Sequence, residues 1–487
     1  LQRRCEEVPP QDAALVVPAL VRLRMAEGEL AAALAQRVAW GGEALRVQDL
    51  AAAAAGFAAL RVSQPKVQES AAKALRRQVH LCTPRAVVQL AAALAEAGDP
   101  EGLRDYLVPA VRSLLFDLSP RDICVVAEAL CRARVADADL LGDLAHGLQP
   151  RVGTMGSHEV SVALNVFAPV AYIAPRLLPL VAGRARDLVD EFGPRQLARV
   201  LQGLSTTGCG DPVLYAALAR RAADLAHVLY GTHAVGMLLA LLDASHLGSS
   251  TLDVLLGAVS RSLDRMTAPD CIVTLHAISR LPADFRCRVP PGLVEELLHA
   301  LRRRGHGPWR AELEAVVHLL EALRALRLED EALLELACDR LPMALRRGGG
   351  SLGLLARALE ELGELPPQSR LQVRTHLHRR PRLRSALRQR LAEHLGRPLD
   401  VESQVSLARA LARLGYEEPM TQDWLDRLVA SVEPQLESLP PAVVCELCWT
   451  LAELNWRADW SRRCARAWLR RRYPGWIPRF RAASEEE

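Results

Sequence analysis

A repeat of about 37 residues constrains this chain more than any other feature of its sequence. Similar segment starts recur 36 to 38 residues apart, at Pro84, Pro120, Ser157, Pro194, Thr232 and Pro269. Three, six and ten residues after each start the side chain is almost always apolar. This spacing places the three positions on one stripe of an α-helix. Proline, serine or threonine suits such a start, because proline is tolerated in a first turn and a hydroxyl can cap it.

A second apolar segment follows the first in each repeat, after a short polar or glycine-containing break. Residues 208–212 form such a break, and residues 213–229 form the segment after it. Two antiparallel helices of this kind cannot bury their apolar faces alone, whereas stacked pairs share one continuous core. The sequence therefore predicts an all-α fold, an α-solenoid of stacked antiparallel helical hairpins.

The repeat is more regular in some parts of the chain than in others, and this variation predicts five parts. Residues 1–82 contain helical patterns without a clear start and are expected to form an N-terminal helical cap. Residues 83–307 hold the regular hairpin repeats, and residues 308–398 hold divergent repeats that end in a basic segment. Residues 399–456 are expected to form C-terminal repeats. Residues 457–487 form a basic, aromatic C-terminal segment with an acidic tail.

Two-helix units of this length resemble the organelle helical-hairpin repeats called heptatricopeptide and octotricopeptide repeats. The most similar stretches are residues 119–141, 401–416 and 441–456, the last of which reads PAVVCELCWTLAELNW. The resemblance implies RNA work in mitochondria or chloroplasts: transcript stabilisation, processing, translation, or a place in the organelle ribosome. We find neither the nuclease-like domain that often follows heptatricopeptide arrays nor the Pro-Pro-x-Glu-Trp-like signature of octotricopeptide repeats. A base-by-base RNA code is therefore not expected.

Two short segments carry the basic charge of the chain. Residues 370–397 and 457–481 each contain nine arginines and one acidic residue, a net charge of +8, so the formal total of +4 leaves −12 on the rest. Arginine pairs bidentately with phosphate. Arginine abundance alone is weak support for nucleic-acid binding, because a chain with two lysines and 59 arginines indicates a coding bias. The positions of the arginines matter more.

Six of the twenty aromatic residues lie in the second basic segment or directly before it, namely Trp456, Trp460, Trp468, Tyr473, Trp476 and Phe480. Aromatic faces can stack on unpaired bases. Alternatively, the tryptophans pack the open end of the last hairpin while the arginines face solvent. The first segment has a similar alternative, an amphipathic helix whose leucines face the core and whose arginines are solvated.

A row of basic residues follows the segment starts. The residues are Arg85, Arg121, His158, Arg195 and His233, and Asp270 ends the row. The helix macrodipole disfavours cations at a helix N-terminus, so local stability does not explain them, whereas a row facing phosphates would. Chance in an arginine-rich sequence is the alternative. The complete set of predicted RNA-binding residues is Arg85, Arg121, Arg195, Arg370, Arg374, Arg379, Arg380, Arg382, Arg384, Arg388, Arg390, Arg462, Arg463, Arg466, Trp468, Arg470, Arg471, Arg472, Trp476 and Arg479.

The sequence carries no catalytic or phosphate-binding motif of the common types. It has no Gly-x-x-x-x-Gly-Lys-Ser/Thr loop, no His-Glu-x-x-His and no Gly-x-Ser-x-Gly. Cys445 and Cys448 form a lone Cys-x-x-Cys, without the second pair that completes a zinc site, and are expected to pack in the core. The longest apolar run, residues 50–60, is too short to span a bilayer. We therefore expect no enzyme, cofactor, metal site, small-molecule substrate or membrane span.

These observations predict a non-catalytic, RNA-associated helical-repeat protein. Its most concrete form is an rRNA-binding scaffold of a mitochondrial ribosome or related RNA–protein particle, with RNA on the C-terminal basic segments and other proteins on the solenoid surface. Two alternatives stay open: an armadillo- or HEAT-like protein scaffold, and an organelle transcript-maturation factor. A chloroplast is the alternative compartment. The chain begins with Leu1, so the expected targeting segment is not visible.

Overall fold

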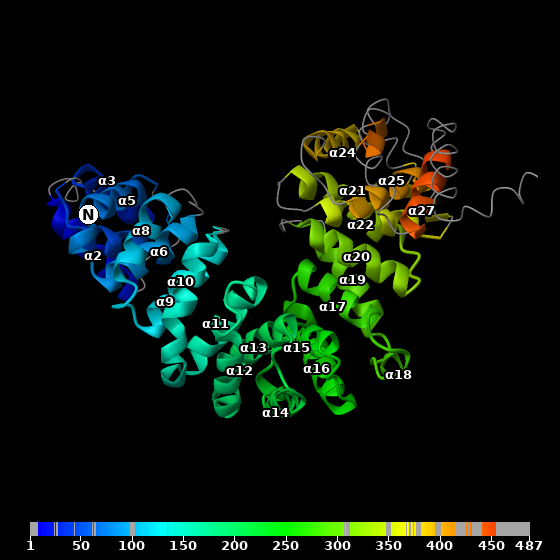
Figure 1. Ribbon diagram of the computed structural model, residues 1–487, viewed down its shortest axis with the longest axis horizontal. Helices are drawn as coiled ribbons and strands as arrows, with labels where there is room; N and C mark the ends of the chain where they lie inside the picture. The colour runs from blue at the N-terminus through cyan, green and yellow to red at the C-terminus, as the bar shows by residue number, and fades with distance from the viewer. Residues whose placement is uncertain are drawn as a thin grey trace, which may run out of the picture. The chain divides into compact units, whose positions relative to one another are not determined.

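The computed structural model is built from α-helices and short 3₁₀ and π turns, and the residues it describes contain no strand (Figure 1). It describes residues 8–97, 103–305, 307, 312–346, 352–394, 401–414, 425–430 and 441–453, apart from gaps at 24, 26–27, 43, 61, 63–64, 134, 136, 367, 370–371, 374, 376–380 and 427. The chain divides into two compact units, Leu1–Ala258 and Val259–Glu487. The predicted all-α solenoid is confirmed.

Each repeat of the first unit contributes a first helix and a second helix. The first helices are α2 (Pro10–Arg22), α4 (Val47–Ala59), α6 (Pro84–Ala97), α9 (Pro120–Arg132), α11 (Ser157–Phe167), α13 (Pro194–Thr207) and α15 (Gly231–Asp243). The second helices are α3 (Gly28–Trp40), α5 (Pro65–Arg77), α8 (Val108–Leu114), α10 (Ala138–Leu148), α12 (Leu177–Asp187), α14 (Pro212–Asp224) and α16 (Ser249–Ser262), whose end passes the unit boundary. Each first helix packs against the next one along the chain.

The first helices begin where the sequence repeat predicts, 36 or 37 residues apart. Four begin at the predicted residue, and α15 begins one residue before Thr232. The same spacing extends back to Pro10 and Val47, in the part of the chain for which no start was found. Serine and acidic caps fix several of these ends. Ser119 and Asp122, for example, form a reciprocal capping box at α9.

The core of the first unit lies between successive first helices. The predicted apolar stripe of α6, Val87, Leu90 and Leu94, is fully buried, and so is that of α9. Two of these helices approach closely at Gly203 of α13, where a Cβ atom would lie 2.8 Å from the backbone of Leu164 in α11. Glycine is therefore required at this position for packing.

The second unit continues the first-helix and second-helix order with longer repeats. Its first helices are α17 (Ala268–Ser279), α20 (Leu313–Ala325), α22 (Leu352–Gly363), α25 (Val401–Arg413) and α27 (Pro441–Glu453), which pack in that order. They begin 39 to 49 residues apart. The other helices are α18 (Ala283–Arg286), α19 (Leu293–Gly305), α21 (Glu331–Arg346) and α24 (Pro381–His394). Among the described helices, none has the length and apolar character needed to cross a bilayer.

Candidate functional site

Many arginines of this chain serve the fold. Near the end of a second helix, an arginine donates to a carbonyl in the loop that precedes the first helix of the same repeat. The Nε···O distances are 3.0 Å from Arg37 to Val8, 3.1 Å from Arg184 to Met155 and 3.2 Å from Arg221 to Phe192. Each pair is separated by 29 residues. We call these side chains the clasp arginines, because each joins the two ends of one repeat.

Other repeats use the same contact with different spacing. Arg151, Arg304, Arg340 and Arg390 also donate to carbonyls ahead of the first helix of their own repeat. This role is not among those predicted from the sequence, although the sequence carries a signal for it. Arg37, Arg184, Arg221 and Arg340 each lie 27 residues after the start of a first helix. The repeat therefore encodes a structural arginine as well as an apolar stripe.

A different set of basic residues lies at the N-termini of the first helices. Arg85, Arg121 and Arg195 are exposed and make no hydrogen bond or ion pair with any residue in the described part of the chain. His158 is exposed as well, and His233 is half-buried. Because the first helices pack side by side in the same direction, these N-termini lie along one edge of the first unit. We call these five residues the basic edge.

Two members of the basic edge on neighbouring helices, Arg195 and His233, interact electrostatically. Burial and the charge of Arg195 together lower the pKa of His233, so this imidazole is neutral near pH 7. Asp270, which ends the row, belongs to the second unit and forms a capping box with Thr267. Within the edge, the carboxylates of Asp122 and Glu159 cap their own helices and offset part of its positive charge.

Exposed apolar side chains precede several members of the basic edge. Leu81, Phe116 and Tyr230 lie in the loops that lead into α6, α9 and α15. Phe116 is 84% exposed and Tyr230 is 55% exposed. The ring of Tyr230 meets that of His233 edge to face, with centroids 6.1 Å apart. The edge therefore combines unpaired guanidinium groups with accessible aromatic faces.

The predicted C-terminal RNA-binding residues lie mostly outside the described residues. Arg382 is exposed at the start of α24, and Arg390 donates to the Leu345 carbonyl at 2.7 Å. Leu383 and Leu387 are buried, as expected if the leucines of this helix face the core. Arg384 and Arg388 lie in α24, but their side chains are not described. Outside the described residues altogether are Arg370, Arg374, Arg379, Arg380, Arg462, Arg463, Arg466, Trp468, Arg470, Arg471, Arg472, Trp476 and Arg479.

The expectation that Cys445 packs in the core is wrong. Cys445 is exposed in α27 and Cys448 is half-buried, whereas Cys124 and Cys271 are buried. Cys445 therefore does not share their environment, although it occupies a similar place in its repeat. Burial raises the pKa of the Cys124 thiol to about 12 and that of Cys271 to about 11, so both stay protonated at neutral pH.

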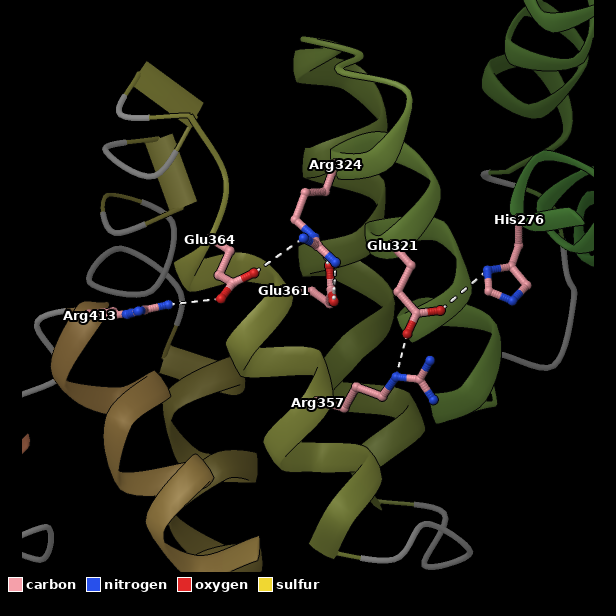
Figure 2. Close-up of polar contacts among 7 residues, drawn as sticks. All are labelled: His276, Glu321, Arg324, Arg357, Glu361, Glu364 and Arg413. Atoms are coloured by element: carbon pink, nitrogen blue, oxygen red, sulfur yellow. Dashed lines mark hydrogen bonds and ion pairs between the residues drawn. The ribbon is translucent and has the colours of Figure 1, made fainter. Parts of the chain in front are cut away.

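A chain of ionic and polar groups, in which the buried carboxylates of Glu321 and Glu361 meet more exposed arginines, crosses several first helices of the second unit (Figure 2). Glu321 of α20 forms an ion pair with Arg357 of α22. Its Oε2 atom lies 3.2 Å from Nδ1 of His276 in α17. Arg324 of α20 donates from Nε and Nη2 to the two carboxylate oxygens of Glu361 in α22. These residues come from different repeats and form no short motif, so their contacts were not predicted from the sequence.

The ionic chain continues to the next repeat. Glu364 lies 3.2 Å from Arg324 and 3.0 Å from Arg413 of α25, each measured from a carboxylate oxygen to a guanidinium nitrogen. Glu321 and Glu361 are each 7% exposed, so their carboxylates depend on these partners. Helices α20, α22 and α25 are thus joined by charge as well as by apolar packing.

Comparisons with known proteins identify no family for this chain. No family model matches the sequence, and no curated protein matches it. One similar structure is a homology model of the full-length AP-3 complex in an intermediate open conformation, at 12% identity and a TM-score of 0.29, over 93% of this chain and 78% of that one. Another is a circular tandem repeat protein with a novel repeat topology, at 16% identity and a TM-score of 0.17, over 95% of this chain and 94% of that one.

Proposed function

We propose that this chain is a non-catalytic helical-repeat scaffold that binds single-stranded RNA along its basic edge. The observation that carries the proposal is the contrast between two sets of arginines. The clasp arginines are committed to backbone carbonyls, whereas Arg85, Arg121 and Arg195 are exposed and have no partner among the described residues. The guanidinium groups of Arg85, Arg121 and Arg195 are therefore available to pair with phosphates.

Two further features support RNA as the partner. Successive first helices present the basic residues in a row, which suits the repeating phosphates of a nucleic-acid strand. Phe116 and Tyr230 supply accessible rings beside that row, and such rings stack on unpaired bases. An organelle ribosome or related RNA–protein particle, in a mitochondrion, is the proposed setting, supported by the resemblance of the repeats to organelle hairpin repeats.

The test measures the affinity of the full chain for a labelled poly-uridine strand at several salt concentrations. The triple variant Arg85→Gln, Arg121→Gln, Arg195→Gln should bind more weakly and with a shallower salt dependence. Each lost phosphate contact should reduce the slope of log K against log salt by about 0.7. Phe116→Ala with Tyr230→Ala should weaken binding while leaving the slope unchanged, since stacking releases no counterions.

A matched control removes the same charge elsewhere. Arg77, Arg176 and Arg220 are exposed residues at second helices and have no partner among the described residues. Their triple glutamine variant should retain the affinity and slope of the parent chain. Equal losses of affinity in the two triple variants would mean that net charge alone explains the binding. That result would contradict RNA binding at the basic edge. Co-sedimentation of the native protein with ribosomal particles, or with proteins alone, then distinguishes the proposed particle from a protein scaffold.

A further inference from the structure

The second unit contains a compact group of metal-ligating side chains where α17 packs against α20. His276 of α17 and His318 and Glu321 of α20 each offer one ligand atom, and these atoms all lie within 4.8 Å of one another. The two imidazole rings are stacked, with centroids 4.1 Å apart and planes inclined by 14°. His276 is 6% exposed and Glu321 is 7% exposed, so the group is enclosed by the fold.

Two of these atoms lack the hydrogen bonds that their burial requires. His276 Nδ1 and Glu321 Oε2 are 3.2 Å apart, yet neither makes a hydrogen bond with suitable geometry to any described residue. Buried polar atoms are nearly always satisfied. In tetrahedral zinc, Zn–N and Zn–O bonds of about 2.0–2.1 Å place neighbouring ligand atoms about 3.3 Å apart. The observed separation therefore matches one edge of a zinc coordination polyhedron.

We propose that His276, His318 and Glu321 form a zinc-binding site that joins α17 to α20, with water as the fourth ligand. Two imidazoles and one carboxylate are a common zinc ligand set. His318 and Glu321 are three residues apart on one helix, so both face α17. His318 is half-buried, which gives a water molecule and an incoming ion access to the site.

The charges around the group are compatible with this assignment. Metal binding requires deprotonated ligands, and burial, more than any other cause, lowers the pKa of both His276 and His318. Arg357 pairs with Oε1 of Glu321 and leaves Oε2 directed at His276 (Figure 2). Arg357 and Arg280 oppose a cation near His276, while the carboxylates of Glu321 and Glu361 offset them.

The experiment uses the full chain, stripped of metal with a chelator and then titrated with zinc under reducing conditions. One equivalent should bind and should raise the melting temperature. His318→Gln should weaken the binding at least about tenfold, because even outer-shell changes cost 10- to 100-fold in metal affinity. His299→Gln is the matched control, since His299 is an exposed histidine of α19, outside the group. It should bind zinc as the parent chain does.

Cobalt substitution distinguishes this group from the cysteines of the chain. Co²⁺ at His276, His318 and Glu321 should give visible d–d absorption without the near-ultraviolet charge-transfer bands of thiolate ligands. The d–d absorption should disappear in His318→Gln and persist in His299→Gln. A parent chain that binds no zinc, or that binds cobalt through thiolates with equal affinity in His318→Gln, would overturn the proposal. The zinc titration of the parent chain tests the proposal directly, so the test does not depend on whether a variant folds.

Discussion

Arg221 donates from Nε to the carbonyl oxygen of Phe192, 29 residues earlier in the chain, at 3.2 Å. Phe192 is buried immediately before α13, and Arg221 lies near the end of α14. This one hydrogen bond joins the two ends of a repeat. Arg184 and Met155 repeat the relationship one repeat earlier, with the same separation along the chain. The helical hairpin is therefore closed by a side chain as well as by packing.

Replacing Arg221 with alanine should destabilise the protein by about 2 kcal/mol, the contribution of a hydrogen bond with one charged partner. The neighbouring Arg220 is exposed and has no such contact. Arg220→Ala should change the stability by less than about 0.5 kcal/mol. Urea unfolding followed by circular dichroism measures both variants. Similar unfolding midpoints for the two would contradict a structural role for Arg221.

Two helical glycines should respond to alanine in opposite directions. Gly203→Ala should destabilise the protein, because the new Cβ would lie 2.8 Å from the backbone of Leu164 and α11 and α13 would have to separate. Gly183 of α12 has open space around it. Gly183→Ala should stabilise by up to about 1 kcal/mol, the difference in helix propensity. Thermal unfolding of the two variants tests the sign, and a stabilising Gly203→Ala would contradict the close approach.

Arg324 should be needed mainly to neutralise Glu361. Arg324→Gln leaves a carboxylate that is 7% exposed without its bidentate partner. We expect a loss of about 2 kcal/mol, below the usual cost of breaking a fully buried pair because Arg324 is partly exposed. Adding Glu361→Gln should recover part of that loss. The exposed pair Arg132–Glu96 is the control cycle and should show a coupling below about 1 kcal/mol. Equal coupling in both cycles would refute the distinction.

Stability should fall on mild acidification because of the buried histidines. Burial, followed by the charges of His318, Arg280 and Arg357, lowers the pKa of His276 from an ordinary value near 6.5 to about 3. Above pH 6.5 the imidazole of His276 is neutral in both the folded and the unfolded chain. Below pH 6.5 it binds a proton in the unfolded chain but stays neutral in the folded chain. The stabilising contribution is thus complete above pH 6.5 and is lost progressively toward pH 3, by up to about 1.4 kcal/mol per pH unit.

Urea midpoints measured between pH 5 and 7, with chelator present, test this dependence. His276→Gln should lower the slope of stability against pH, whereas the exposed His299→Gln should leave it unchanged. Glu321 acts in the opposite direction, because burial raises its pKa from 4.5. Its effect sets in as the pH rises above 4.5, where the unfolded chain loses a proton that the folded chain keeps. Comparison of His276→Gln with the parent chain therefore isolates the histidine. An unchanged slope in His276→Gln would contradict the assignment.

The sequence predicted the fold of the first unit well because its signal is local. A helix start and an apolar stripe repeat at 37 residues, and each can be read within one turn or two. The helix starts at Pro10 and Val47 were not predicted, and residues 1–82 were expected only to form a helical cap. Asp12 and Asp49 lie in the first turns of these helices and were a readable sign of N-termini.

The side-chain sites were harder to predict because they join residues from different repeats. His276 and Glu321 meet only because α17 packs on α20, and no short motif encodes that contact. The arginines of the basic edge were found from their register. The clasp arginines occupy an equally regular register but were overlooked, because an exposed cation and a hydrogen-bonded one look alike in a sequence. Position within the repeat, rather than residue type, separates the two roles.

Because the hydrogen bond from each clasp arginine begins and ends inside one repeat, a repeat copied or lost as a whole takes both donor and acceptor with it. Duplication or deletion in steps of 37 residues would leave no guanidinium without its carbonyl. An insertion within a repeat requires a different spacing between donor and acceptor, as Arg151 and Arg304 show. An array closed in this way is able to change its length during evolution more freely than it can change the length of its parts.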